Sequence, residues 1–286
     1  MSTNFPRTTV AGESLSRMII GTNWLLGYSH TSPSADAQIR RAYQSSEDFF
    51  PMFEAFMSHG VDTLMGPIAS NPHITAAIEF ARQKLGRDFV IIDTPIINVS
   101  DSQEARREAE KSIRDCANIG AKFCLIHHSS AEQLVNKNLG ILSRIDDYTK
   151  MIRDAGMIPG LSAHMPELIT FSDANEYDIE TYIQIYNCMG FLMQVEIETI
   201  AATINNAKKP VMTIKSMAAG RCTPYVGLTF SWNTIRPCDM VTVGCFTPQE
   251  VEEDIEISLA AIEHRFPVLE RRASPNNNQA AFAGAK

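Results

Sequence analysis

Short apolar segments alternate with longer amphipathic segments along almost the whole chain. Residues 121–127 are the clearest apolar run, and it ends at two adjacent histidines, His127 and His128. Runs of this kind are typical of strands that are buried on both faces of a parallel sheet. We predict such strands at residues 16–23, 61–65, 89–93, 121–127, 158–162, 192–196, 211–215 and 240–244.

Segments with helical periodicity follow these runs. Within residues 46–59, for example, Phe49, Phe53 and Phe56 recur at helical spacing, and Gly60 ends the pattern. We predict helices at residues 35–43, 46–59, 74–85, 103–118, 139–155, 179–189, 200–207, 224–235 and 248–265.

Eight strand-then-helix units in a chain of 286 residues indicate an α/β protein with a closed (β/α)8, or TIM, barrel in a single domain. No glycine-rich dinucleotide or phosphate-loop motif opens a helix, which makes an open Rossmann sheet the weaker interpretation. We expect a polar, extended lead-in at residues 1–14, the barrel at residues 15–272, and a disordered tail at residues 273–286, where Asn, Ala and Gly dominate.

The composition restricts the kinds of molecule that the protein is expected to bind. The formal net charge of −8 argues against surfaces that bind nucleic acid or anionic membranes, because both require basic patches. No apolar run approaches the roughly 18–20 residues of a membrane span, and the amino end has no apolar signal region. The six cysteines form no C-x-x-C pair, so a zinc ribbon or an iron–sulfur site is unsupported, and we expect free thiols in a cytoplasmic protein.

Ionisable residues end several of the predicted strands. In a barrel, the carboxyl ends of all strands open onto one face, so these residues are expected to meet in one pocket that binds a small-molecule substrate. The candidates are Asn23, Asp62, Asp93, His127, His128, Ser162, His164, Glu167, Gln194, Glu196, Glu198, Lys215 and Cys245.

Two chemistries use this set. In the first, His127 or His128 binds a divalent zinc, manganese or iron ion together with His164 and Glu196, with Asp93 as a further candidate ligand. The metal would polarise a carbonyl group or activate water. The catalytic acids or bases would come from Asp62, Asp93, His127, His128, Glu198 and Lys215.

In the second chemistry, the same histidines, aspartates and Lys215 perform general acid–base catalysis without a metal. Several of these residues also have a purely structural interpretation. Asp62 and Asp93 are suited to turns, and Lys215 is suited to an ion pair with Glu196 or Glu198. Adjacent strand residues face opposite sides, so one of the two neighbouring histidines is expected to pack structurally.

The order of these motifs resembles the aldo-keto reductase superfamily over roughly residues 15–262. Residues 60–63 are similar to the segment with the catalytic aspartate of that family, at Asp62, and residues 125–127 to the strand with its catalytic histidine, at His127. The resemblance implies a barrel that binds NADP. The implied cofactor-binding residues are Ser162, Gln194, Gly244 and Thr247.

The chain departs from the family at its catalytic tyrosine and lysine. Residues 62–75 contain no tyrosine, and Pro67 stands about where it belongs. Pro95 stands in place of the lysine, Ala163 in place of an asparagine that binds nicotinamide, and residues 245–253 are acidic. A reductase needs an acid that protonates the alkoxide, so these departures favour another reaction.

We therefore favour a non-redox enzyme, an isomerase, lyase or hydrolase, that acts on a small carbonyl or sugar-like substrate. The alternatives are an NADP-dependent oxidoreductase and a non-catalytic binding protein on the same barrel. The sequence leaves the oligomeric state open.

Overall fold

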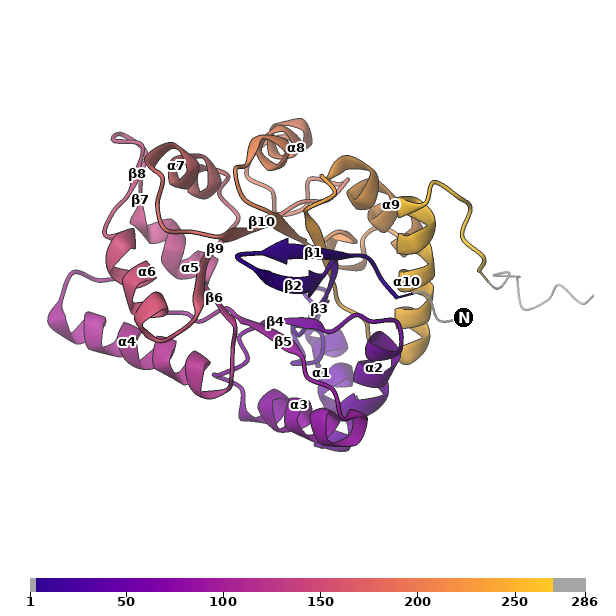
Figure 1. The fold of residues 1–286 in the computed structure, drawn as a ribbon. Helices are drawn as coiled ribbons and strands as arrows, with labels where there is room; N and C mark the ends of the chain where they lie inside the picture. Colours follow the sequence, from indigo (N-terminus) through magenta and orange to yellow (C-terminus); the bar gives the residue numbers. More distant parts are fainter. Residues whose placement is uncertain (1–3, 270–286) are drawn as a thin grey trace, which may run out of the picture.

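Eight parallel strands form a closed barrel at the centre of the protein (Figure 1). The structure is a computed structural model that describes residues 4–269. Pairing of Val241 with Met18 joins the last strand to the first and closes the ring. In order around the barrel, the strands are β3 (Met18–Gly21), β4 (Thr63–Gly66), β5 (Val90–Asp93), β6 (Phe123–Ile126), β9 (Ile158–Ala163), β10 (Thr181–Ile185), β11 (Val211–Ile214) and β12 (Met240–Val243). The predicted (β/α)8 fold is confirmed.

Helices surround the barrel and bury their apolar faces against the strands (Figure 1). Phe49, Phe53 and Phe56 are buried, as their helical spacing predicts. The helices are α1 (Pro33–Ala42), α2 (Ser46–Ser58), α3 (Pro72–Leu85), α4 (Gln103–Asn118), α5 (His128–Ala131), α6 (Ile145–Asp154), α7 (Glu167–Asn175), α8 (Ile197–Asn206), α9 (Pro224–Thr234) and α10 (Pro248–Ile262), with short 3-10 turns η1 (Glu132–Leu134) and η2 (Ala218–Gly220).

The inside of the barrel is a packed apolar core, as in other TIM barrels. Side chains from most of the strands fill it, and two residues of an amino-terminal hairpin close it from below. The core residues are Val10, Leu15, Ile19, Met65, Ile92, Phe123, Leu125, Ile183, Met212 and Met240. A substrate therefore has access only above this layer, at the carboxyl ends of the strands.

The amino-terminal residues form more than the extended lead-in that the sequence predicts over 1–14. Strands β1 (Arg7–Val10) and β2 (Glu13–Ser16) pair as an antiparallel hairpin that covers the amino end of the barrel (Figure 1). The predicted tail, residues 273–286, and the last residues of the predicted barrel domain lie outside the described residues.

One predicted pair of elements is wrong. The predicted helix at 179–189 is the strand β10, and the predicted strand at 192–196 is an irregular loop before α8. All five residues of β10 are buried, and periodicity does not distinguish such a run from a buried helix. The helix α7, which precedes β10, was not predicted.

The connection between β6 and α6 is also more elaborate than the single helix predicted at 139–155. It contains α5, η1 and a small hairpin of β7 (Val135–Asn136) and β8 (Ile141–Leu142) before α6 begins. The two histidines therefore follow the fourth barrel strand and begin a short helix, with His127 as the N-cap of α5 and His128 as its first residue.

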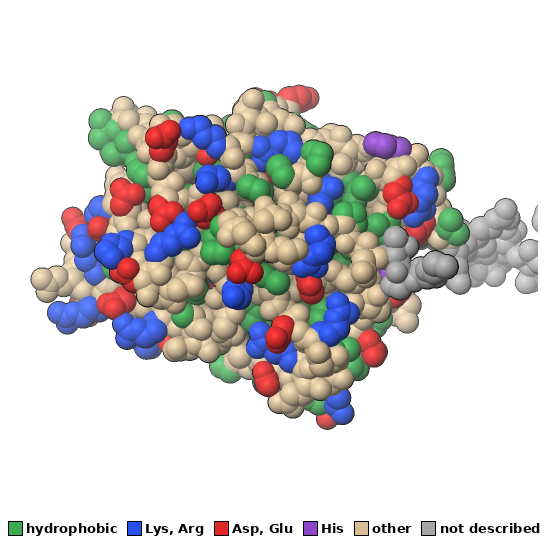
Figure 2. All heavy atoms as spheres, viewed as in Figure 1, with side chains coloured by type: hydrophobic (Ala, Val, Ile, Leu, Met, Phe, Trp, Pro, Cys, Tyr) green, Lys and Arg blue, Asp and Glu red, His purple; other side chains and the backbone are tan. Residues whose placement is uncertain are grey.

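Acidic and basic side chains are intermixed on the face that shows the amino-terminal hairpin (Figure 2). Among the described residues, none of the helices combines the length and apolar character needed to cross a bilayer.

At the amino end of the barrel, Asp239 forms a buried ion pair. Its carboxylate, fully buried, lies 2.7 Å from Arg236 Nη2 and accepts a hydrogen bond from the Val211 backbone N–H at 2.8 Å. Arg17 Nε donates to the Asp239 backbone carbonyl at 2.9 Å. The pair thus joins the beginnings of three neighbouring barrel strands.

We expect Asp239→Ala to lower the free energy of unfolding by about 3–5 kcal/mol, because it leaves Arg236 without its partner. Glu110→Ala, which removes an exposed pair with Arg114, should cost no more than about 1 kcal/mol. Urea unfolding of both variants tests this, and equal losses in the two would contradict it.

Candidate functional site

Three histidines stack at the carboxyl ends of the neighbouring strands β6 and β9. The rings of His127 and His128 lie 4.2 Å apart between centroids, and those of His128 and His164 lie 3.9 Å apart with an angle of 19° between their planes. Strand β6 ends at Ile126, so His128 already belongs to α5 and the strand rule that would separate the adjacent histidines does not apply. Both histidines therefore lie in the cluster.

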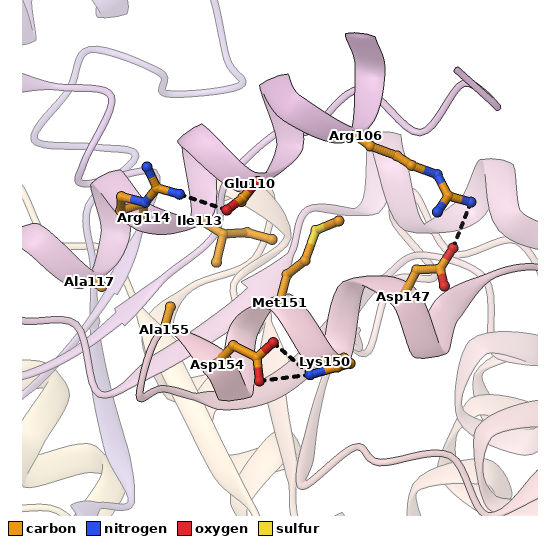
Figure 3. A pocket seen from close by; sticks show the side chains of 10 residues that line it. All are labelled: Arg106, Glu110, Ile113, Arg114, Ala117, Asp147, Lys150, Met151, Asp154 and Ala155. Carbon is orange, nitrogen blue, oxygen red and sulfur yellow. Dashed lines mark hydrogen bonds and ion pairs between the residues drawn. The ribbon is translucent and has the colours of Figure 1, made fainter. Parts of the chain in front are cut away.

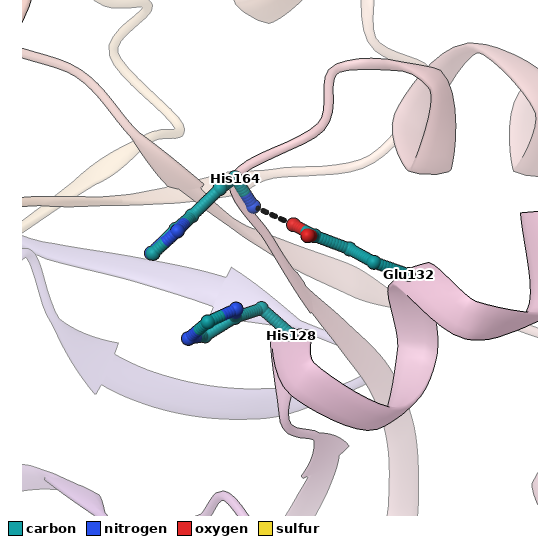
Figure 4. Close-up of side chains that lie close together, drawn as sticks. All are labelled: His128, Glu132 and His164. Atoms are coloured by element: carbon teal, nitrogen blue, oxygen red, sulfur yellow. Dashed lines mark hydrogen bonds between the residues drawn. The ribbon is translucent and has the colours of Figure 1, made fainter. Parts of the chain in front are cut away.

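Glu132 is a member of this cluster that sequence reasoning missed. Its Oε1 accepts the backbone N–H groups of His164 at 2.6 Å and Met165 at 3.0 Å, which ties the start of η1 to the residues that follow β9 (Figure 4). The signal that would have revealed it is its spacing of four residues from His128, because such residues lie on one face of a helical turn.

Ligand atoms of His128, Glu132 and His164 all lie within 4.8 Å of one another. Two imidazole nitrogens and one carboxylate oxygen suit zinc, manganese or iron. The imidazole lone pairs lie in the ring planes, and in Figure 4 the two rings lie nearly parallel. A shared ion therefore requires one ring to turn until its lone pair points toward the other ligands.

This group differs from the metal ligands predicted from the sequence, His127, His164 and Glu196. Glu196 is exposed at the N-cap of α8, in the loop where a strand was predicted. Without that strand, nothing directs its side chain into the barrel. Glu132 stands where the carboxylate was expected, and of the two predicted alternatives, His127 and His128, it is His128 that lies with His164.

Burial keeps the histidines of the cluster neutral. Burial, His128 and Lys215 lower the pKa of His164 to about 3, and the same causes lower the pKa of His127 to about 4. Burial also lowers the pKa of His128 and of His30, which lies in the loop after β3. Neutral imidazole is the form that binds metal ions, so the lowered pKa values are compatible with metal binding by these histidines.

Lys215 follows β11 and lies close enough to the cluster for its charge to lower the pKa of all four histidines. Its own pKa is lowered by burial. The sequence placed Lys215 at the carboxyl end of a barrel strand, and the structure brings it together with the predicted histidines.

His127, the N-cap residue of α5, is held in one tautomer by its contacts with Ser129. Ser129 donates its backbone N–H to His127 Nδ1 at 3.3 Å, and the Ser129 hydroxyl lies 2.8 Å from the same atom. Because Nδ1 accepts, the proton of the neutral ring is on Nε2. His127 therefore presents an N–H donor.

A surface groove of about 440 Å³ between α4 and α6 is not part of this cluster (Figure 3). Its charged residues already pair with one another, Arg114 with Glu110 at 2.6 Å and Lys150 with Asp154 at 2.7 Å. It contains none of the residues at the barrel mouth and offers no convergent catalytic groups.

Comparison with known proteins identifies the fold alone. No family model matches the sequence, and no curated protein is significantly similar to it. A structure from Pseudomonas aeruginosa described as an aldo-keto reductase superposes with a TM-score of 0.66 at 12% identity, covering 92% of this chain and 98% of that chain. The chain has an aldo-keto-reductase-like barrel.

Two further structures delimit that likeness. An aldo-keto reductase from Klebsiella pneumoniae in complex with NADPH gives a TM-score of 0.55 at 12% identity, covering 96% of this chain and 98% of that chain. A truncated 3-deoxy-D-arabino-heptulosonate 7-phosphate synthase from Thermotoga maritima gives 0.52 at 11% identity, covering 91% and 90%. The aldo-keto-reductase-like barrel therefore does not by itself specify a reaction.

Two predicted catalytic aspartates do not reach the mouth of this aldo-keto-reductase-like barrel. Asp62 precedes β4, at the amino end of the barrel, and lies 2.9 Å from Arg7 of the hairpin. Asp93 ends β5, but its neighbour Ile92 faces the barrel interior, so Asp93 faces the helices. There it accepts the Ala69 N–H at 2.7 Å, and burial raises its pKa to about 6.

The loop that replaces the predicted strand also displaces Gln194 and Glu198. Gln194 is exposed in that loop, and Glu198 is exposed in the first turn of α8. A different glutamine, Gln184 of β10, lies near the cluster, where its Nε2 lies 3.3 Å from the His164 backbone carbonyl. Sequence reasoning missed Gln184 because it assigned that segment to a helix.

The other three predicted cofactor-binding residues lie in or just after barrel strands, but two of them are engaged locally. Ser162 is buried on β9, two residues before His164. At Gly244 a Cβ atom would lie 2.6 Å from Trp24, so an indole ring already covers this position. Thr247 caps α10, and the Glu250 carboxylate accepts the backbone N–H groups of Phe246 at 2.6 Å and Thr247 at 3.3 Å.

We expect the chelator-treated protein to lose stability as the pH falls from 7 to 4. Between the unfolded pKa of a histidine, about 6.5, and the folded values of about 4 for His127 and about 3 for His164, the unfolded chain binds protons that the folded chain does not. The stability that is present above pH 6.5 is therefore lost through this window.

His164→Ala should flatten this dependence, whereas His264→Ala, which removes an exposed histidine, should leave it unchanged. Because its pKa is raised, Asp93 changes the free energy of unfolding with pH in the opposite direction. This contribution is the same in the wild type and in both variants. Urea midpoints at pH 7, 5.5 and 4.5 provide the measurement, and parallel curves for wild type and His164→Ala would refute the explanation.

Proposed function

We propose that the mouth of the barrel is the active site of an enzyme that acts on a small carbonyl or sugar-like substrate by metal-assisted, non-redox acid–base chemistry. Isomerases, lyases and hydrolases use chemistry of this type. The observation that carries the proposal is the group of His128, Glu132 and His164, within 4.8 Å of one another at the carboxyl ends of two barrel strands. In TIM barrels this end is where catalytic residues gather.

His128 and His164 would supply neutral nitrogen ligands, and Glu132 would supply the oxygen that does not accept the two backbone N–H groups. Three protein ligands leave coordination positions for a substrate or a water molecule. An ion bound there would polarise a carbonyl oxygen or lower the pKa of a bound water.

The surrounding residues would complete the chemistry. His127, whose ring presents an Nε2–H, would donate a hydrogen bond to a substrate oxygen as negative charge develops on it. Lys215 adds a positive charge on the neighbouring side of the mouth. Gln184 would position His164 through its hydrogen bond to the His164 carbonyl.

We expect the purified protein to bind one zinc, manganese or iron ion per chain. His128→Ala, Glu132→Ala or His164→Ala should each weaken binding by about 10-fold or more, since each removes one of three protein ligands. Elemental analysis and competition with a chelating dye measure this. His73→Ala, a histidine of α3, is the control.

Wild-type protein without metal at saturating ion concentrations would contradict the metal assignment. So would ion binding that is equal in the wild type and in the three ligand variants.

An NADP-dependent reductase is the second candidate, and the likeness to the Klebsiella structure described with NADPH favours it. The residues present fit that cofactor poorly. Glu250 occupies the backbone donors at the start of α10 where a phosphate would bind, and residues 245–253 contain no Lys or Arg. The loops after β4 and β5, residues 67–71 and 94–102, contain neither tyrosine nor lysine.

We expect no change in NADPH fluorescence when the protein is titrated with cofactor up to about 1 mM, because enzymes bind their substrates at or below this range. A saturable change with a dissociation constant in the micromolar range would instead support the reductase. Glu250→Gln provides an internal comparison, since removal of this carboxylate should strengthen any residual binding.

A further inference from the structure

Lys215 is a half-buried cation without a counter-ion. Among residues 4–269, no carboxylate lies within ion-pair distance of its ammonium group, and it makes no hydrogen bond through its side chain. Lysines on the outer surface behave differently: Lys137 and Lys150 are more exposed, and they pair with Glu167 and Asp154 at 2.6 and 2.7 Å. A partly desolvated charge without a partner is costly, so this arrangement requires an explanation.

The carboxylates at the mouth do not pair directly with Lys215. Its electrostatic neighbours are the four histidines, and His30 is also influenced by Arg221. Two carboxylates act on the same histidines as Lys215, and both accept backbone or hydroxyl donors instead. Glu132 accepts two backbone N–H groups, and Asp36 accepts the backbone N–H and hydroxyl of Ser29 at 2.8 and 2.6 Å. The Lys215 ammonium group is therefore left without a direct anionic partner among the described residues.

The backbone holds Lys215 in place. Its φ is 62°, in the left-handed region, and the nearby Ala218 and Ala219 have φ values of 50° and 53°. The Ala218 N–H closes this turn by donating to the Lys215 carbonyl at 2.7 Å. Strained, non-glycine backbone persists where the surrounding structure enforces it, often at functional sites. The turn thus fixes the backbone from which the Lys215 side chain extends.

We propose that Lys215 binds an anionic group of the substrate, a carboxylate or a phosphate. The inference rests on the proposed function of the mouth and deepens it: the substrate is a small carbonyl compound that carries a negative charge next to its reacting group. Arg221, an exposed residue whose charge also reaches His30, adds to the attraction of an anion.

The test is isothermal titration calorimetry of the full chain, in buffer with a chelator, with three separate probes. Inorganic phosphate represents a phosphorylated substrate, pyruvate a carboxylated one, and dihydroxyacetone a neutral carbonyl compound. We expect millimolar or tighter binding of at least one anion. Lys215→Met should weaken this binding at least 10-fold, and Lys215→Arg should retain it. Lys111→Met, on the exposed face of α4, is the matched control.

Binding of phosphate alone assigns a phosphorylated substrate, and binding of pyruvate alone assigns a carboxylate. The proposal is overturned if neither anion binds the wild type, if Lys215→Met binds the anion as well as the wild type does, or if Lys111→Met loses binding to the same extent. Retention in Lys215→Arg shows that a loss in Lys215→Met does not come from misfolding.

The outcome separates this inference from the proposed function. The double variant His128→Ala with His164→Ala removes two metal ligands but leaves Lys215 intact. If the wild type binds no metal yet both proteins bind the anion through Lys215, the metal-assisted function fails and the anion site stands. If metal binds and anions do not, the reverse holds.

Discussion

Closure of the barrel by the pairing of β12 with β3 is the constraint on which the rest of the structure depends. The eight strands of this closed ring are parallel and point the same way. The residues that follow each strand therefore lie together on one rim. His128 follows β6, His164 follows β9, and Lys215 follows β11, and these residues are separated by up to 87 positions in the sequence. Glu132 then adds a local constraint, because its carboxylate ties the β6 and β9 connections together.

Buried and partly buried charges are paired differently at the two ends of the barrel. At the amino end, Asp239 pairs with Arg236 and Asp62 pairs with Arg7, so burial of these groups is compensated within the protein. At the carboxyl end, the histidines are kept neutral by burial, and Lys215 has no carboxylate partner within residues 4–269. The amino end therefore stabilises the fold, while the carboxyl end retains interactions that a ligand can complete. A metal ion and an anionic substrate are the two ligands whose chemistry matches these groups.

The sequence predicted the barrel because each unit repeats the same strong alternation of a short apolar run and a longer amphipathic helix. It failed at β10, where burial on both faces removes the alternation that distinguishes a strand from a buried helix. That single error directed Glu196 into the barrel in the prediction and hid Gln184. Asp93 was misplaced for another reason: strand parity decides which face a residue occupies, and the exact parity is set by the register of the neighbouring strands.

The histidines and Lys215 were predictable because they directly follow strands whose ends are well defined. Glu132 begins the three-residue turn η1 directly after the four-residue helix α5, and both elements are too short to show a periodic pattern. The resemblance to aldo-keto reductases extends to the barrel, which three-dimensional comparison supports at 12% identity. Local contacts determine the chemistry at the mouth, and the overall fold does not.

Anomalous diffraction from crystals soaked with zinc or manganese locates a bound ion directly. The account predicts one strong peak at the barrel mouth, about 2.0–2.2 Å from a nitrogen of His128, a nitrogen of His164 and an oxygen of Glu132. Metal peaks confined to other parts of the surface, with the rings of His128 and His164 still stacked in the soaked crystal, would contradict it.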